Sequence, residues 1–233
     1  VGDSVCADID DARRDAVKRN HSACHLLQAA LRRVLGSHVE QAGSYVDNER
    51  CRFDFTHFSA LTSDELKKVE ALVNAHILAA NEIVTKETDI DTARKEGAMA
   101  LFGEKYGKTV RMVKMGDFST ELCGGTHCAN TSNIGLFKII SESSVAAGVR
   151  RIEAVTGLGV IRLIEDNDKL ISDTAKALKA NNTADMPQRA VSLQNEISAQ
   201  KKEIDELNRK IAGMKLDTLI CDAKAVKLSL IHI

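Results

Sequence analysis

The stretch "RNHSACHLL", residues 19–27, lies inside a longer run, residues 11–36, whose apolar residues recur at helical spacing. Gly36 supplies a stop signal, so the run predicts one long helix. His21 and His25 are four residues apart and therefore share one face of that helix. Two such histidines can bind a single ion, but without a further ligand they are more often solvated.

A second group of candidate ligands stands much later in the chain, in "ELCGGTHC", residues 121–128. Cys123 and His127 flank a Gly-Gly pair, which lets the backbone turn tightly enough for a thiolate and an imidazole to converge. Three imidazoles and one thiolate suit zinc. We therefore predict that His21, His25, Cys123 and His127 are zinc ligands.

Ser22 argues against one class of zinc enzyme, the zincin proteases. A zincin protease needs a glutamate directly after the first histidine as general base, and Ser22 occupies that position. A purely structural zinc finger usually has more thiolates and shorter loops between its ligands. The predicted site can be structural, or can face a pocket with one position open to water or substrate, and spacing does not distinguish the two.

The remaining patterns predict an α+β fold in which an antiparallel sheet packs with helices. Strands are expected at 3–9, 109–115, 135–144 and 149–157, together with a hairpin in "GSYVDNERCRFDF". A capping box from Thr62 to Glu65 opens a helix expected to run to residue 87 and to include Val84 in its apolar stripe. Asp91 is expected to cap a shorter helix over "TARKEGAMALF". The segment from Cys123 to His127, which contains the Gly-Gly pair, is called the glycine loop. The metal would lie between the long N-terminal helix and this loop.

The second half of the chain predicts a helical arm. We expect one domain over residues 1–160 and an arm over 161–227, with a break at "ANNTADMPQ" around the single proline, Pro187. The arm carries a heptad pattern, formed by Leu193, Ile197, Ile204, Leu207, Ile211 and Met214. It predicts either a short coiled coil or a helical hairpin. Residues 228–233, "LSLIHI", resemble a translated sequencing adapter and are given no functional weight.

Composition excludes several classes of protein. The net charge of −1 provides no global basic field for nucleic acid, so any RNA contact needs a local patch. Aromatic residues make up 3% of the chain, too few for a base-stacking platform. Neither a signal peptide nor a membrane-spanning run is present, and six cysteines without a CxxC pair suit a reducing cytoplasm. Because the chain begins at Val1, we expect a fragment.

Several motifs together resemble one family. They are "RNHSACHLLQAALR", "GSYVDNERCRFDFTH", "GAMALFGEKYG", "GDFSTELCGGTH" and "IGLFKIISESSVAAGVRRIEAVTG". Over roughly residues 5–215 the chain resembles the editing region of alanyl-tRNA synthetases of the bacterial type. The resemblance implies the editing-domain fold of threonyl- and alanyl-tRNA synthetases, in the cytoplasm.

The resemblance also implies an activity, which is hydrolysis of the ester that joins serine or glycine to alanine-specific tRNA. It makes His21, His25, Cys123 and His127 the Zn²⁺ set, and places Gln41 in the editing pocket. The expected catalytic residues are His21, His25, Cys123 and Gln41. The expected partners are the tRNA(Ala) acceptor end and the remaining parts of the synthetase, with a homo-oligomer possible. The aminoacylation core is absent, so ligase activity is not expected.

Cys24 departs from the family pattern, which has threonine immediately before the second histidine. In the family that threonine lies in the editing pocket and bears on substrate choice. A thiol is a larger and weaker hydrogen-bonding group than a hydroxyl, so discrimination of serine from alanine is in question. Alternatively, Cys24 adds a sulfur near the metal.

Further candidates for substrate contact are Arg150 and Arg151, which lie on opposite faces of a strand and equally suit ion pairing. The basic run of Arg13, Arg14, Lys18 and Arg19 could guide phosphates, although a solvated helix face is the commoner role. Asp54 could orient a ligand histidine, but an ion pair is the commoner role. Other functions stay open. They are a non-catalytic zinc module that binds tRNA, the related editing domain of threonyl-tRNA synthetase, and a free-standing alanyl-tRNA editing protein.

Overall fold

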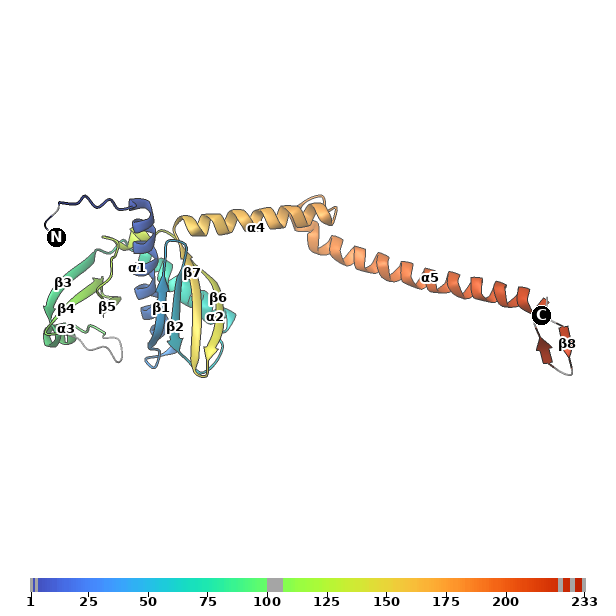
Figure 1. Ribbon diagram of the computed structural model, residues 1–233, viewed down its shortest axis with the longest axis horizontal. Coiled ribbons are helices and arrows are strands. Elements are labelled where there is room, and N and C mark those ends of the chain that lie inside the picture. The colour runs from blue at the N-terminus through green and yellow to red at the C-terminus, as the bar shows by residue number, and fades with distance from the viewer. Residues whose placement is uncertain (1, 3, 100–106, 222–223, 227–228, 232–233) are drawn as a thin grey trace. The chain divides into compact units, whose positions relative to one another are not determined.

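The computed structural model describes residues 2, 4–99, 107–221, 224–226 and 229–231 (Figure 1). The chain forms two compact units, residues 1–165 and 166–233. The first unit holds both predicted halves of the metal site. Residues 4–9 have no regular structure, so the strand expected at 3–9 is wrong.

Helix α1, Asp11–Leu35, is the central element of the first unit. The Asp10 side chain caps its first turn, and Gly36, at φ 120°, ends it with a conformation that favours glycine. From Asn20 to Leu31 nearly every residue is buried, polar ones included. In Figure 1 α1 lies between two antiparallel sheets, and it contacts strands of both.

The larger sheet has the order β1-β2-β7-β6 and is antiparallel throughout. Its strands are β1 (Gln41–Val46), β2 (Cys51–Thr56), β6 (Phe137–Ala146) and β7 (Val149–Thr156). The hairpin expected around residues 43–55 is confirmed, and Cys51, Phe53 and Phe55 on β2 are fully buried in the core. The two later strands are also confirmed, joined at Gly148 with φ 72°.

Helix α2, Ser63–Leu78, packs against α1 and begins with the expected Thr62–Glu65 capping box. It ends before residue 87, so the expected helix was too long, and Val84 lies instead on strand β3 (Ile83–Asp89). The position where α2 ends is set by a tertiary contact. Thr131, a fully buried residue, donates to the His76 carbonyl and accepts from the Asn81 N–H, which terminates the helix.

The smaller sheet has the order β3-β4-β5, with β4 at Thr109–Met115 and β5 at Ser119–Leu122. Strand β4 is as expected, whereas β5 was missed, because no element was predicted for residues 119–122. Helix α3, Ile90–Lys95, is capped by Asp89 rather than Asp91. The rest of the helix expected there falls partly on residues 100–106, outside the described residues. The 3₁₀ turn η1, Thr131–Ile134, follows the glycine loop.

Helix α4 (Leu158–Ala177) crosses the boundary between the units, at residues 165 and 166, whereas the sequence pattern placed it at residue 160. The second unit continues with η2 (Thr183–Asp185), α5 (Met186–Cys221), β8 (Lys224–Val226) and β9 (Ser229–Ile231). Among the described residues of the arm, the last helix ends at Cys221 and Lys224–Val226 form a strand. No helix among the described residues is long and apolar enough to cross a membrane.

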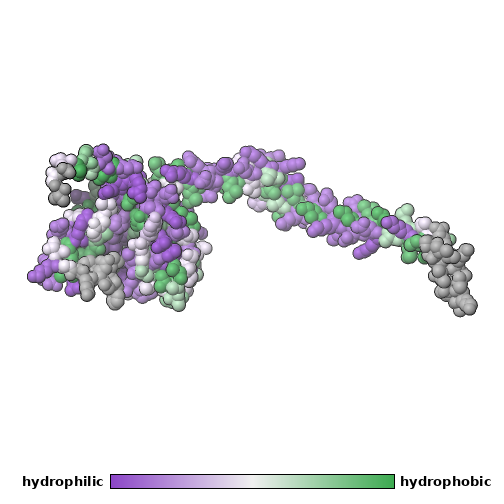
Figure 2. Space-filling view, viewed as in Figure 1, coloured by the Kyte–Doolittle hydropathy of each residue, from purple (hydrophilic) through white to green (hydrophobic). Residues whose placement is uncertain are grey.

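The heptad residues all lie on α5, a single continuous helix of 36 residues. Most are exposed, and Figure 2 shows apolar side chains at the surface along the helix. The exposed ones are Ile197, Ile204, Leu207, Ile211 and Met214. The α+β fold with antiparallel sheets, helices packed on them and a long helix after them is confirmed.

Candidate metal centre

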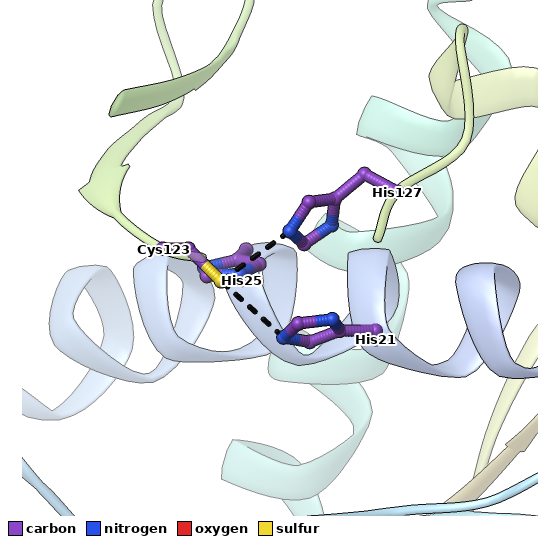
Figure 3. Close-up of side chains that lie close together, drawn as sticks. All are labelled: His21, His25, Cys123 and His127. Carbon is purple, nitrogen blue, oxygen red and sulfur yellow. Dashed lines mark hydrogen bonds between the residues drawn. The ribbon is translucent and has the colours of Figure 1, made fainter. Parts of the chain in front are cut away.

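Four side chains from two distant segments converge beside α1 (Figure 3). His21 and His25 project from adjacent turns of α1, whereas Cys123 and His127 come from the loop that follows β5. The Cys123 Sγ lies 3.5 Å from His21 Nε2 and 3.4 Å from His127 Nε2. One donor atom from each of the four residues falls within 4.8 Å of the others.

These distances fit a tetrahedral zinc ion. Bond lengths of about 2.3 Å to sulfur and 2.0–2.1 Å to nitrogen place the two kinds of ligand atom roughly 3.6 Å apart in such a site. The Nε2 atom of His25 supports the same assignment, because it is buried and has no hydrogen-bond partner among the described residues. A bound cation would satisfy this atom, so the residues present fit the metal.

Each histidine of the set has a hydrogen-bond partner at Nδ1, which leaves Nε2 for the ion. The pairs are His21 with the Thr126 carbonyl at 3.2 Å, His25 with Glu121 Oε2 at 2.6 Å, and His127 with Ser22 Oγ at 3.2 Å. Outer partners of this kind fix the tautomer and the orientation of a ligating imidazole. Ser22, which argued against a protease, therefore has a positive role in holding His127.

Glu121 was not predicted from the sequence. It is 5% exposed, and its second oxygen accepts a hydrogen bond of 3.0 Å from Ser119 Oγ. A signal did exist, because Glu121 stands two positions before Cys123, and residues two apart in extended chain point to the same face; Cys123 directly follows β5, and its N–H still donates to the Arg111 carbonyl. Without strand β5 that relation could not be recognised.

The glycine loop is fitted closely around His21. A Cβ atom on Gly125 would lie 2.1 Å from His21 Cε1, whereas one on Gly124 would meet no atom within 4 Å. The guanidinium of Arg111, on β4, donates to the carbonyls of Cys123 and Gly125. Of the two glycines, only Gly125 lies where a side chain would clash with a neighbouring residue.

The site favours a thiolate at Cys123. Burial opposes ionisation of this thiol, but hydrogen bonds from His127 and His21 outweigh it and lower the pKa of Cys123 to about 3. For His25, burial lowers the pKa, but the negative charges of Glu121 and Cys123 and the hydrogen bond to Glu121 raise it to about 10. The thiolate is the form that binds zinc, and His25 must release a proton from Nε2 for that atom to bind metal.

A small cavity of about 90 Å³ opens beside three of the four residues, His21, His25 and Cys123. Cys24 and Gln41, both predicted substrate-binding residues, also line it. The Gln41 Nε2 donates to Ser44 Oγ at 3.2 Å. Gln28 and Ser44 were not predicted, although Gln28 stands three residues after His25 and so shares its helical face.

Cys24 lines this cavity but is not one of the four clustered donors. A hydrogen bond with Cys51 and then burial raise the pKa of the Cys24 thiol well above its usual value. The group therefore stays protonated at neutral pH. This favours the interpretation of Cys24 as a pocket residue over that of a further sulfur ligand.

Arg150 and Arg151 do not line the cavity. Arg150 pairs with Glu142, and Arg151 forms two hydrogen bonds with Asp54, at 2.7 and 2.8 Å. Asp54 is thus an ion-pair partner and contacts no histidine of the metal set. Of the residues predicted to contact substrate, the structure places Cys24 and Gln41 at the metal centre and these two arginines elsewhere.

Comparison with known proteins agrees with this geometry. Residues 110–153 match the family described as the second additional domain of threonyl and alanyl tRNA synthetases. The alanine–tRNA ligase of Acetivibrio thermocellus is 54% identical over 228 residues, and alanine–tRNA ligase 1 of Lachnoclostridium phytofermentans is 52% identical over 231. The resemblance to the editing region of alanyl-tRNA synthetases is confirmed.

The similarity covers 98% of this chain in both cases, but the chain spans only 26% of the length of either relative. The alanine–tRNA ligase of Pseudomonas syringae, 48% identical over 231 residues, shows the same proportions. The chain is thus similar to one segment of the alanyl-tRNA synthetases, and the matched domain includes Cys123, His127 and their loop.

Proposed function

We propose that this chain contains the zinc-dependent editing site of an alanyl-tRNA synthetase, which hydrolyses seryl- and glycyl-tRNA(Ala). One observation carries the proposal. Three imidazoles and a thiolate converge beside a small cavity, in a chain similar over nearly its whole length to alanine–tRNA ligases. The proposed reaction is addition of water to the ester carbonyl, with release of the amino acid and the free ribose hydroxyl.

The cavity suits a small aminoacyl group. Its volume of about 90 Å³ leaves room for only a small group. Size alone cannot reject serine and glycine while sparing alanine, because one is larger and the other smaller. A polar partner for the serine hydroxyl is therefore needed, and Gln28, Gln41 and Ser44 supply polar groups in the cavity wall.

His21, His25, Cys123 and His127 would hold the zinc ion, which supplies Lewis-acid polarisation of the ester or of water when bound. Glu121 keeps the Nδ1 proton on His25 and thus leaves Nε2 free as a ligand. Ser44 fixes the Gln41 amide, which would orient the substrate. His127 does not line the small cavity, and we propose that it anchors the ion from the other side.

The test is single-turnover deacylation of seryl-, glycyl- and alanyl-tRNA(Ala), with zinc content measured in parallel. The wild type should release serine and glycine faster than alanine. His25→Ala should lose most of its bound zinc and its activity. His76→Ala is the matched control, because His76 stacks on Phe118 and is not part of the metal set. Full activity in His25→Ala would contradict the proposal.

A second candidate function is a zinc-stabilised tRNA-binding module without activity. It is favoured by Cys24, a protonated thiol in the cavity wall where the family has threonine. Cys24→Thr separates the two functions. Hydrolysis that appears only in Cys24→Thr supports the inactive module, whereas activity in the wild type excludes it.

The proposal includes the expected partners and compartment. These are the acceptor end of tRNA(Ala), the remaining parts of a synthetase chain, and the cytoplasm. A reducing compartment keeps the Cys123 thiolate available as a ligand.

A further inference from the structure

A second and larger cavity, of about 480 Å³, lies on the other side of the metal centre. His127 forms part of its wall, so the two cavities flank the cluster of donor atoms. Its other lining residues include Asp15, Lys18, Arg19, Thr85 and Asn133. Its volume falls within the usual range of small-ligand sites, and nothing in the proposed hydrolysis uses it.

The wall of this cavity carries net positive charge. Lys18 forms a 3.1 Å ion pair with Asp15, whereas Arg19 pairs with no acidic side chain among the described residues. An unpaired guanidinium in a concave polar site favours an anion with several oxygens.

The local structure holds Arg19 in place. The next residue, Asn20, is buried and is fixed by hydrogen bonds to the Asp47 carbonyl at 2.9 Å and Thr156 Oγ1 at 2.7 Å. The side chain of Arg19 passes beside Gly157, where a Cβ would lie 3.3 Å from its Cδ and Nε. The guanidinium is thus positioned by a packed segment of α1 and not by a free helix end.

We propose that this cavity binds a phosphate of the tRNA 3′ strand, with Arg19 as the main contact and Lys18 as a second. The inference rests on the proposed function, because it takes the scissile ester to lie at the metal centre. In an aminoacylated tRNA the phosphate of the terminal nucleotide is separated from that ester by a single ribose. A cavity that shares His127 with the metal centre is therefore suitably placed for it.

The test is binding of an uncharged tRNA(Ala) acceptor-stem hairpin ending in CCA, measured by fluorescence anisotropy over a series of NaCl concentrations. Lys18→Gln/Arg19→Gln is compared with Lys67→Gln/Lys68→Gln, a matched loss of two exposed cations on α2. The first variant should bind at least fivefold more weakly at low salt. Its salt slope should fall by roughly 0.7 for each phosphate that the variant no longer neutralises.

A hairpin that lacks its single-stranded 3′ end should abolish the difference between the two variants. The proposal is overturned if the variants bind alike, if the difference persists on the shortened hairpin, or if the wild type shows no salt-dependent binding. Zinc content should be equal in both variants, which excludes damage to the metal centre. Binding requires no hydrolysis, so an inactive chain that passes this test would overturn the proposed activity but not the phosphate site.

Discussion

Three residues that were not predicted as partners of the ligands hold the histidines of the metal centre. Ser22, Glu121 and Thr126 each bind the Nδ1 atom of one ligand imidazole. The four donors themselves were predictable from residue type and spacing, because HxxxH on a helix puts both rings on one face. Their partners were not, because each belongs to a segment far from its histidine in the chain or was not recognised as a strand.

Glu121→Gln tests the role of the carboxylate. The amide can still accept from His25 Nδ1 but carries no charge, so we expect zinc affinity to fall roughly tenfold or more. Competition with a chromophoric chelator measures the dissociation constant. Glu87→Gln, at an exposed position on β3, is the control. Equal affinities for the two variants would show that the carboxylate does not support the metal.

Gly125→Ala tests the packing of the glycine loop. The new methyl group would lie 2.1 Å from His21 Cε1, so His21 must leave its position and zinc content should fall well below one ion per chain. Gly124→Ala adds the same methyl group where no atom lies within 4 Å, and it should retain zinc. Metal analysis of both proteins is the measurement, and equal occupancy would be evidence against a close fit of the loop to the helix.

At the scale of elements, local signals predicted α1, the β1–β2 hairpin, β4 and the β6–β7 pair. The expectations that failed concern the end of α2, the strand at 3–9 and the missing β5. The apolar pattern through residue 87 favoured a longer helix. The helix ends earlier because Thr131, which follows β5 in the chain, forms hydrogen bonds with backbone groups at the end of α2. Segments whose ends are set by distant hydrogen bonds cannot be delimited from local pattern alone.

Thr131→Val tests this helix end. The substitution keeps the shape of the side chain but leaves the His76 carbonyl and the Asn81 N–H without their buried partner. We expect a loss of about 1–3 kcal/mol in the free energy of unfolding. Thr85→Val, at an exposed strand position, should change little. Urea denaturation followed by circular dichroism measures both, and a neutral Thr131→Val would refute this role.

At the scale of the whole molecule, the metal centre joins two segments of the first unit that are distant in sequence. The ligands lie on α1 and on the loop after β5, so a bound ion would link residues 21 and 127 directly. Binding that is restricted to the folded state stabilises it by mass action.

Zinc removal should therefore lower the unfolding temperature. Free zinc at a hundred times its dissociation constant stabilises a folded protein by about 2.7 kcal/mol. For a chain of this size that corresponds to a shift of roughly 5–10 °C. Differential scanning calorimetry with and without chelator measures it. Cys123→Ser should show no response to chelator, and a wild type that behaves in the same way would contradict a zinc site in the folded chain.

Residue identity and spacing were sufficient to predict the α+β class and the four candidate ligands, and to recognise the family resemblance. Helical and strand periodicities are local properties of the chain, so they can be read from sequence alone. The tertiary structure alone brought Glu121 to His25, closed the small cavity around Cys24 and Gln41, and directed Arg150 and Arg151 into ion pairs. These relations join residues that are distant in sequence. They depend on how α1 packs between two sheets, which no local pattern specifies.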